Sequence, residues 1–501
     1  FWVSRAPKDH ARNTEDYFLA GRALPWWIIG FSLIASNIST EQIIGMNGTA
    51  FLSGIAVISY SWIGACIPQI LVAKFFLPTF LKMKIYSMPQ FLEARFDRRV
   101  STGMGVFWLL VYVFVNLTSV MYLGALTLET ITGLPLIYGI LALAAVSALY
   151  TVYGGLAPVA WTDFIQVVVL LGGGVIVTVF GLDAASGGAG AWNGFIHLME
   201  SSPEKFHTVL SVNHPDLPWP GVFLGGLWIA ALSYWGCNQY IIQRALAARS
   251  LRQAQYGLIF ASFLSLIVSV TIVLPGVIAS ALFGDVITKA DQAYPTLVRQ
   301  LIPVGYTGLI IAALFAAIIS SLNSMTNSAA TIFTMDVYRK MVRRAASDKE
   351  LLWVGRLASA AALTTAVVLA PRLTGLAQVF QFIQEYTGFV TPGVFAIFVF
   401  ALFWKRTTSN AALAAALLTI PVSAFLKLLL PGLGFLNRMG ITFVILSALI
   451  ILISLLSKSC NVEVERPRPQ LEDSSFETPL LFNVLALVMM GTIAALYLYF
   501  R

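Results

Sequence analysis

Apolar stretches of about 18 or more residues recur from one end of this 501-residue chain to the other. A helix of about 20 apolar residues crosses the hydrocarbon core of a bilayer, so each stretch is a candidate membrane span. We count thirteen and expect an all-α polytopic membrane protein. The expected spans are 24–52, 55–81, 101–131, 135–152, 158–182, 220–241, 254–283, 302–334, 352–371, 376–403, 409–430, 438–457 and 479–500.

The composition excludes a soluble enzyme. Hydrophobic residues make up 58% of the chain and charged residues 11%, where a soluble protein carries about 25% charged residues. The cysteines Cys66, Cys237 and Cys460 have no paired spacing, so neither a disulfide scaffold nor a zinc site is expected. A phosphate-binding Gly-rich loop ending in Lys-Ser or Lys-Thr is absent, which argues against an ATP-driven pump. We expect no organic cofactor and no catalytic residues.

Lys and Arg are sorted between alternate loops. With the polar stretch 4–23 placed in the cytoplasm, 23 of the 31 basic residues fall in cytoplasmic segments and 7 on the opposite side. Lys74 alone lies within a span. Such a bias marks the cytoplasmic loops. The net charge of +8 therefore records membrane topology, and it indicates lipid bilayer, not nucleic acid, as the partner. We expect a multi-pass protein of the plasma (cell inner) membrane.

A polar block, Ser36 to Gln42, interrupts the first span. Ser, Asn and Thr side chains compete for backbone hydrogen bonds, so the helix is expected to unwind here. Free carbonyls and a half-helix end would then face a buried cavity, as in secondary transporters. A continuous helix with ordinary interhelical hydrogen bonds is the alternative. The presence of Glu41 in the block favours the broken helix.

The sixth span carries a matching interruption at residues 233–240, five spans after the first. An inverted repeat of five helices requires this spacing. Tyr234 and Trp235 lie in it and are also suited to a membrane-interface belt, which is the alternative interpretation.

Three further groups of polar residues lie at membrane depth. One face of the eighth span is rich in hydroxyl groups, which serve either close helix packing or the binding of a desolvated cation. It comprises Ser320, Ser321, Ser324, Asn327, Ser328 and Thr331. The tenth span has Gln378, Gln381, Gln384 and Glu385 on one face, which suits a hydroxylated solute. Asp163 begins the expected fifth span, either as a helix N-cap or beside a cation.

Several segments resemble the sodium/solute symporter family. The stretch 133–158, ending Tyr-Thr-Val-Tyr-Gly-Gly-Leu-Ala-Pro, and the stretch 312–339, with Phe-Ala-Ala-Ile-Ile-Ser-Ser-Leu-Asn-Ser, are similar to its two signatures. Residues 238–244, Asn-Gln-Tyr-Ile-Ile-Gln-Arg, and 383–388, Ile-Gln-Glu-Tyr-Thr-Gly, resemble its sodium/glucose cotransporter branch, especially bacterial sodium/galactose symporters. The likeness extends from residue 13 to the end of the chain.

The resemblance implies the LeuT-type fold of five-plus-five inverted repeats, with discontinuous first and sixth spans and peripheral helices outside. The chain opens at Phe1 without Met, which we take to mean that an upstream helix is missing. The implied divisions are a cytoplasmic segment 1–23, a first repeat 24–183, an extracellular loop 184–219, a second repeat 220–403 and peripheral helices 404–501.

The resemblance also implies two binding sites. Sodium would be held by the backbone carbonyls of Ala35, Ile38 and Ala317 and by the hydroxyls of Ser320 and Ser321. Asp163 and Ser324 align with the region where some members hold a second sodium ion. The implied solute site comprises Asn37, Gln42, Tyr60, Ser61, Tyr234, Trp235 and Gln384, with Tyr234 as an aromatic gate.

The chain departs from the galactose carriers at three positions. They have an acidic residue, an Asn and a Lys where this chain has Ser61, Ala231 and Ser265. We therefore expect sodium-driven symport of a different small neutral hydroxylated solute, a sugar or a polyol, by alternating access. A symporter for an amino acid, a carboxylate or a sialic acid is the nearest alternative, and a solute-gated channel or sensor is a more distant one. No protein partner is indicated.

Overall fold

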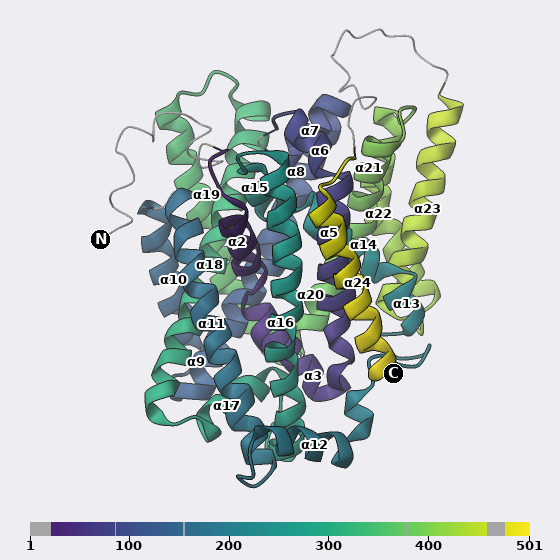
Figure 1. The fold of residues 1–501 in the computed structure, drawn as a ribbon. Coiled ribbons are helices and arrows are strands. Elements are labelled where there is room, and N and C mark those ends of the chain that lie inside the picture. The colour runs from purple at the N-terminus through teal and green to yellow at the C-terminus, as the bar shows by residue number, and fades with distance from the viewer. Residues whose placement is uncertain (1–21, 86, 154–155, 377, 458–475) are drawn as a thin grey trace.

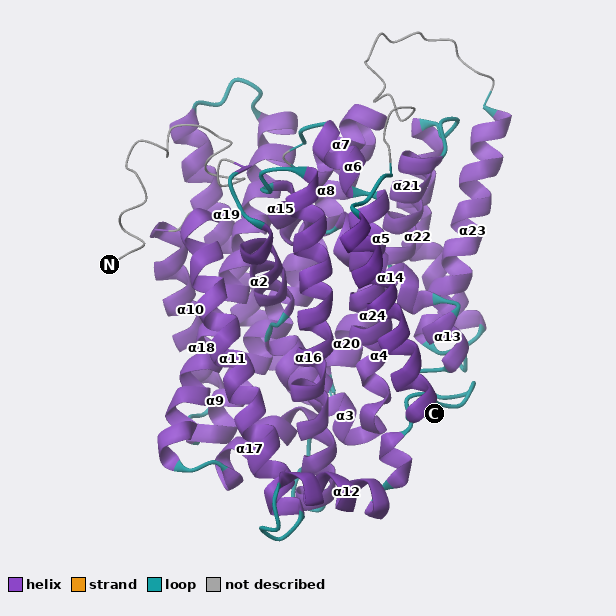
Figure 2. Ribbon diagram, viewed as in Figure 1, coloured by secondary structure: helices purple, strands orange, loops and turns teal. Residues whose placement is uncertain are grey.

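The computed structural model describes residues 22–85, 87–153, 156–376, 378–457 and 476–501, without the side chains of 150–163, 348–349 and 352. Every regular element in these ranges is helical (Figure 2). Among the described residues, ten helices are long and apolar enough to cross a membrane, and the bent pair α20–α21 would make an eleventh. Thirteen spans were expected; the apolar helices Trp26–Asn37 and Leu136–Leu149, in the first and fourth of them, are too short to be counted on their own. The expected all-α polytopic fold is confirmed.

The helices follow the expected order of spans. Spans one to five are α2 (Trp26–Asn37) with η3 (Glu41–Met46) and α3 (Asn47–Ser53); η4 (Gly54–Ile58), α4 (Ser59–Ser61), η5 (Trp62–Cys66), α5 (Ile67–Phe75) and α6 (Leu77–Lys82); α8 (Arg98–Leu110), η6 (Val111–Leu117) and α9 (Thr118–Thr132); α10 (Leu136–Tyr153); and α11 (Leu156–Ala185). Spans six to ten are α13 (Trp219–Phe223), α14 (Gly226–Cys237) and α15 (Gln239–Leu246); α16 (Leu251–Phe283); α18 (Val304–Thr331) with η9 (Ile332–Val342); α19 (Asp348–Leu369); and α20 (Val379–Gly388) with α21 (Thr391–Phe403).

Three more spans and several short helices complete the fold. The last spans are α22 (Ser409–Leu429), α23 (Phe435–Leu456) and α24 (Leu480–Tyr499). The connections hold α7 (Met88–Arg95), α12 (Ala191–Ser201), η7 (Pro203–Phe206), η8 (Ala290–Gln292), α17 (Ala293–Leu301) and η10 (Ala370–Gly375). Figure 1 shows α22 and α23 along one edge of the molecule, outside the helices that surround α2.

Both expected interruptions are present. The first helix ends at Asn37, and Ile38 leaves helical geometry with φ −76° and ψ 85° before the chain resumes in the wide π turn η3. The sixth span breaks at Asn238, whose φ of −81° and ψ of 123° are extended. Each break lies in the middle of a span, where unpaired backbone groups must face protein or a cavity.

The tenth span also breaks, although the sequence indicated one helix over 376–403. Its halves α20 and α21 meet at 48°. Pro392 is one cause, because it has no N–H to continue the hydrogen-bond ladder. Thr419 of α22 satisfies the groups set free: its Oγ1 accepts from Gly393 N at 3.1 Å and donates to Phe389 O at 3.1 Å.

The loops assemble at two opposite ends, in the two sets that the basic residues predicted. At one end, Lys340 of η9 contacts Glu93 of α7 at 2.6 Å. At the other end, Lys205 donates to Leu52 O at 2.7 Å, and Thr208 N donates to Phe500 O at 2.8 Å. Figure 1 shows α6, α7 and α15 at one end and α3, α12 and α17 at the other. Which end faces the cytoplasm stays a prediction.

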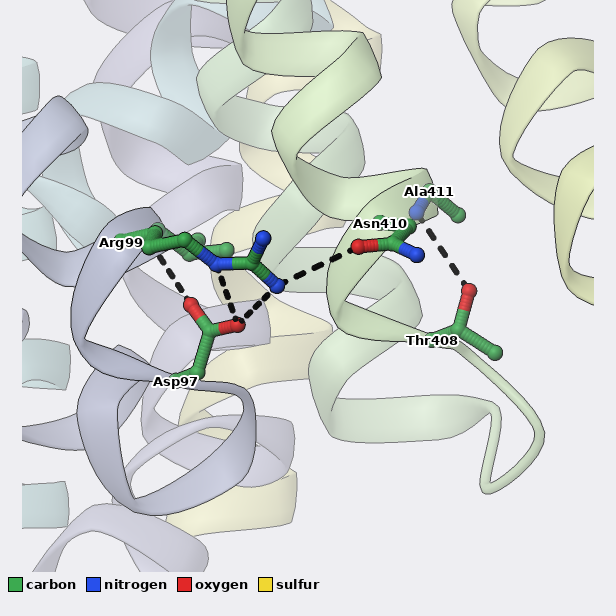
Figure 3. Close-up of polar contacts among 6 residues, drawn as sticks. Asp97, Arg99, Thr408, Asn410 and Ala411 are labelled. Carbon is green, nitrogen blue, oxygen red and sulfur yellow. Dashed lines mark hydrogen bonds and ion pairs between the residues drawn. The ribbon is translucent and has the colours of Figure 1, made fainter. Parts of the chain in front are cut away.

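One polar cluster joins the core to a peripheral helix (Figure 3). Asp97 caps α8 by accepting a hydrogen bond from Val100 N at 3.1 Å, and Arg99 contacts the same carboxylate at 2.9 Å. Arg99 also donates to Asn410 Oδ1 at 3.3 Å, at the start of α22. Burial alone would raise the pKa of Asp97, but the Val100 N–H and the Arg99 guanidinium outweigh it, and the pKa is lowered.

Candidate solute and sodium sites

A cavity of about 160 Å³ lies where the breaks of the first and sixth spans meet the second, third and tenth spans. All seven residues expected to bind solute line it: Asn37, Gln42, Tyr60, Ser61, Tyr234, Trp235 and Gln384. These residues are up to 347 positions apart in the chain, so the fold brings them together. Their assignment to a solute stays a prediction that this convergence favours.

Ser39 organises the first break. Its backbone N–H binds Asn37 O at 2.9 Å, and its hydroxyl accepts the Glu41 N–H at 3.1 Å. The same hydroxyl donates to Gln42 Oε1 at 2.9 Å. Gln42 is therefore held in one orientation, with its Nε2 as the donor left to a solute.

Aromatic side chains separate the cavity from the α7–α15 end. Tyr240 donates to the hydroxyl of Tyr234 at 2.9 Å, and Tyr112 donates to Asn238 Oδ1 at 2.5 Å. The indole N–H of Trp235 donates to Gly64 O at 3.1 Å, which fixes its ring against the second span. Tyr234 and Asn238, at the helix break, therefore line the cavity side by side with this aromatic group.

Close backbone packing seals the opposite side. Tyr60 meets Phe380 edge-on, with ring centroids 5.2 Å apart. A Cβ added at Gly45 would lie 2.7 Å from Phe380 Cβ, so a glycine is required for α20 to approach the first span. Gln378 donates to Gly45 O at 2.9 Å and ties the two elements together.

The polar residues on one face of the tenth span have different contacts. The expectation that this whole face binds the solute is therefore wrong. Gln384 alone of the four lines the cavity. Gln378 caps α20 and binds Gly45, and Glu385 contacts Lys427 and Arg438, each at 2.9 Å. The bend in α20–α21 and its neighbours, not helical periodicity, decide these directions.

Several residues that line the cavity were not predicted from the sequence to bind solute. Glu41 and Asn116 line the cavity, and Asn116 lies on the π turn η6 of the third span. Glu41 Oε1, Asn116 Oδ1 and the hydroxyl of Tyr60 are buried without a hydrogen-bond partner among the described residues. The signal for Asn116 was present, because a polar residue in the middle of an apolar span needs an explanation.

The three departures from the galactose carriers do not share one place. Ser61 and Ala231 line the cavity. Ser265 is buried in α16 and accepts a hydrogen bond from Gln69 Nε2 at 3.2 Å. It is not among the lining residues, so the expectation that position 265 shapes this cavity is not supported.

The first break also frees two carbonyls of the expected sodium site. In a continuous helix the N–H groups of Ser39 and Gln42 would bind Ala35 O and Ile38 O. Here Ser39 N binds Asn37 O and Gln42 N binds Ser39 O. Ala35 and Ile38 are both buried, so these oxygens need another partner.

The remaining expected ligands lie on α18, which packs against α2 and α11. Ala317 and Ser321 are buried, and Ser320 is half-buried. Neither serine hydroxyl donates back to its own helix, as Thr331 does to Asn327 O at 2.8 Å. Neutral carbonyl and hydroxyl oxygens suit a hard monovalent cation. The described residues contain no cluster of three His, Cys, Asp or Glu that could hold a metal ion.

The second sodium region is partly outside the described residues, because the side chain of Asp163 is not among them. The backbone shows position 163 within α11, which begins at Leu156, so the N-cap interpretation is wrong. Ser324 lies half-buried on α18.

A second cavity, of about 650 Å³, opens at the α7–α15 end. Asn327, Ser328 and Thr331 line it. The C-terminal part of the hydroxyl-rich face of α18 therefore faces this cavity. Gln239 lines it as well, one residue beyond Asn238 of the solute cavity. The break in the sixth span therefore borders both cavities.

Comparison with known proteins identifies the family. The profile of the sodium:solute symporter family matches residues 17–419. The chain belongs to this family. It is 45% identical over its whole length to the sodium/glucose cotransporter of Vibrio parahaemolyticus, of which it covers 95%. It is 34% identical over 81% of its length to sodium/myo-inositol cotransporter 2 of Mus musculus, and spans 64% of that protein.

The fold agrees with the family. A Na⁺-coupled sialic acid symporter in a substrate-bound outward-open state superposes with a TM-score of 0.76 at 24% identity, over 89% of this chain and 92% of that one. The LeuT-type arrangement is confirmed. This sodium:solute symporter is an integral multi-pass protein of the plasma membrane, and it is a transporter, not an enzyme. Sodium is its coupling ion.

Proposed function

We propose that the protein transports a neutral sugar or polyol together with sodium, and that the solute binds in the cavity lined by Gln42, Tyr234 and Gln384. The chemistry of the lining carries the proposal. Amides, hydroxyls, aromatic rings and one carboxyl line the cavity, whereas no Lys, Arg or His from the described residues does. A carboxylate-bearing solute would bring an unpaired charge into this site, which is costly. A neutral solute with many hydroxyls avoids that cost.

The unpartnered atoms of the cavity support the same solute class. Asn116 Oδ1 is buried and can only accept a hydrogen bond, while the Tyr60 hydroxyl can also donate. An unsatisfied buried polar group costs about 1–3 kcal/mol. A sugar or a polyol supplies hydroxyl donors to such acceptors. The aromatic faces of Tyr234 and Trp235 would pack against its apolar C–H surface.

Sodium would couple to this solute through the first span. The expected ion bridges Ala35 and Ile38 of the first span to Ser321 of the eighth, and the same break presents Gln42 to the solute. Binding of the ion would therefore order the helix ends that form the solute site. Each bound species would bias the same two-state element, which is the condition for coupling.

Release would proceed toward the 650 Å³ cavity at the α7–α15 end. Tyr234 and the Tyr112–Asn238 contact separate it from the solute cavity, so rotation of these groups would open a path. One sodium ion moving down 100 mV releases about 2.3 kcal/mol, and a tenfold gradient adds about 1.4 kcal/mol. Together they would sustain a solute accumulation of roughly a few hundredfold.

The test is uptake into proteoliposomes with an inward sodium gradient. The panel contains D-glucose, D-galactose, myo-inositol, proline and N-acetylneuraminic acid. Sodium-dependent accumulation of a sugar or myo-inositol is expected. Accumulation of proline or of the sialic acid alone would contradict the proposed solute class. Solute flux that ignores the sodium gradient would contradict coupled symport and favour a channel.

A further inference from the structure

Glu41 is the one acidic side chain that lines the solute cavity among the described residues. It lies on η3, directly after the break in the first span, and only 8% of its surface is exposed. Its Oε1 atom is fully buried and has no hydrogen-bond partner among the residues that the structure describes. A buried carboxyl with a free oxygen is costly unless something in the cavity binds it.

The described side chains around the Glu41 carboxyl are bonded to other groups. The hydroxyl of Ser39 is already engaged, since it accepts the Glu41 backbone N–H and donates to Gln42. The hydroxyls of Tyr234 and Tyr240 are bonded to each other at 2.9 Å. No ion pair of the described residues includes Glu41. The carboxyl therefore resembles a binding group without its ligand.

The position of Glu41 indicates that its ligand is the solute and not sodium. Glu41 shares its cavity with Asn37, Gln42 and Gln384, whereas no residue of α18 lines this cavity. The expected sodium ligands Ser320 and Ser321 belong to α18, so the carboxyl faces the solute space. A carboxylate is an acceptor at both oxygens and holds two neighbouring hydroxyl donors at once.

We propose that Glu41 determines solute specificity by accepting hydrogen bonds from two adjacent hydroxyl groups of the bound sugar or polyol. The inference rests on the proposed function and narrows it to solutes with a vicinal diol. An analogue that lacks one of the two hydroxyls leaves the carboxylate half-satisfied. Sites that hydrogen-bond a hydroxyl reject the analogue that lacks it far more strongly than apolar pockets reject a missing methylene.

The experiment measures KM for the best sugar of the panel and for its monodeoxy derivatives in proteoliposomes. In the wild type, the two deoxy derivatives that each lack one of two adjacent hydroxyls are expected to bind roughly tenfold to a hundredfold more weakly, as for hydrogen bonds to a charged group. In Glu41→Gln the parent sugar should bind more weakly to a similar extent, and the preference over these two derivatives should fall to about twofold, because the charge is gone. Glu41→Asp keeps the charge and should retain part of the preference.

Glu129→Gln is the matched control. It makes the same chemical change at a carboxyl that accepts Leu136 N at 3.1 Å, outside the cavity. Its KM should equal that of the wild type, and the amount of protein in the membrane is measured for all variants.

The possible outcomes are distinct. A wild type that transports no member of the sugar panel contradicts the proposed function itself. A wild type that transports sugar, with unchanged parent KM and unchanged deoxy preference in Glu41→Gln, overturns the inference alone. A shift confined to the KM for sodium also overturns it and assigns the carboxyl to a cation. KM and the preference for the parent sugar do not depend on the amount of protein, so they decide the question even if Glu41→Gln or Glu41→Asp reaches the membrane in smaller amounts.

Discussion

Ser321 shows how one hydroxyl connects local helix chemistry to ion coupling. It is 8% exposed on α18, and its Oγ makes no side-chain hydrogen bond within the described residues. Ser321→Ala removes this oxygen and barely changes the volume. We expect the KM for sodium to rise about tenfold or more, since an orphaned cation ligand costs as much as a hydrogen bond to a charge.

The measurement is sodium-dependent uptake at saturating sugar. Ser359→Ala is the control, because Ser359 is similarly buried but lies on α19, which carries none of the expected sodium ligands and does not line the solute cavity. An unchanged sodium dependence in Ser321→Ala and in Ser320→Ala would place the ion elsewhere, with Asp163 and Ser324 as the next candidates.

Ser39 is a positioning residue for the solute site. Its hydroxyl holds Gln42 in one orientation and caps the Glu41 N–H. In Ser39→Ala the Gln42 amide is free to rotate, so we expect the solute KM to rise about twofold to tenfold, as for one neutral hydrogen bond. Ser39→Thr keeps the hydroxyl and should restore the KM. Gln42→Ala should raise the KM by more than Ser39→Ala, and the reverse order would contradict the assignment.

At the scale of elements, η8 connects α3 and α20 at the end of the fold opposite the α7–α15 cavity. Asp291 of η8 is 2% exposed, and its Oδ2 accepts a hydrogen bond from Val379 N at 2.9 Å, at the start of α20. Its Oδ1 has no hydrogen-bond partner in the described part of the chain. A Cβ at Gly48 of α3 would lie 2.9 Å from that oxygen. Three elements, α3, η8 and α20, therefore meet at one carboxyl.

Burial raises the pKa of Asp291 from 3.8 to about 7, against the lowering effects of the Val379 N–H and of Lys289. The folded protein thus binds this proton more tightly than the unfolded chain, and stability falls as pH rises from about 4 to about 7. Asp291→Asn imitates the neutral form. We expect it to raise the Tm in detergent by a few degrees at pH 8 and to have little effect at pH 4, where the carboxyl is largely protonated in both states. Equal Tm shifts at both pH values would contradict a raised pKa.

At the scale of the whole molecule, the two sets of loops predict sidedness. Val212 lies in an exposed loop at the α12 end, and Arg344 is exposed at the α7–α15 end. In a Cys460→Ser background, an impermeant thiol reagent should label Val212→Cys from outside intact cells and Arg344→Cys only after permeabilisation. Cys66 and Cys237 are buried and serve as the unlabelled baseline. Labelling of both positions from the same side would refute the topology.

The sequence by itself determined the helical class, the order of the spans and the breaks in the first and sixth spans. These features depend on neighbouring residues in the sequence. A membrane span needs a long apolar run, and a polar block within such a run has few structural explanations. The resemblance to sodium/solute symporters added the seven solute residues, which the fold then gathered around one cavity.

Only the tertiary structure decided where individual side chains point. The periodicity of the tenth span placed Gln378, Gln384 and Glu385 on one face. In the structure, Gln378 binds Gly45, Gln384 lines the cavity and Glu385 binds Arg438. The unpartnered oxygens of Glu41 and Asn116 are likewise invisible in sequence, because satisfaction of a polar group depends on every element packed around it. Periodicity fixes the face of a helix, whereas its neighbours and bends decide what that face meets.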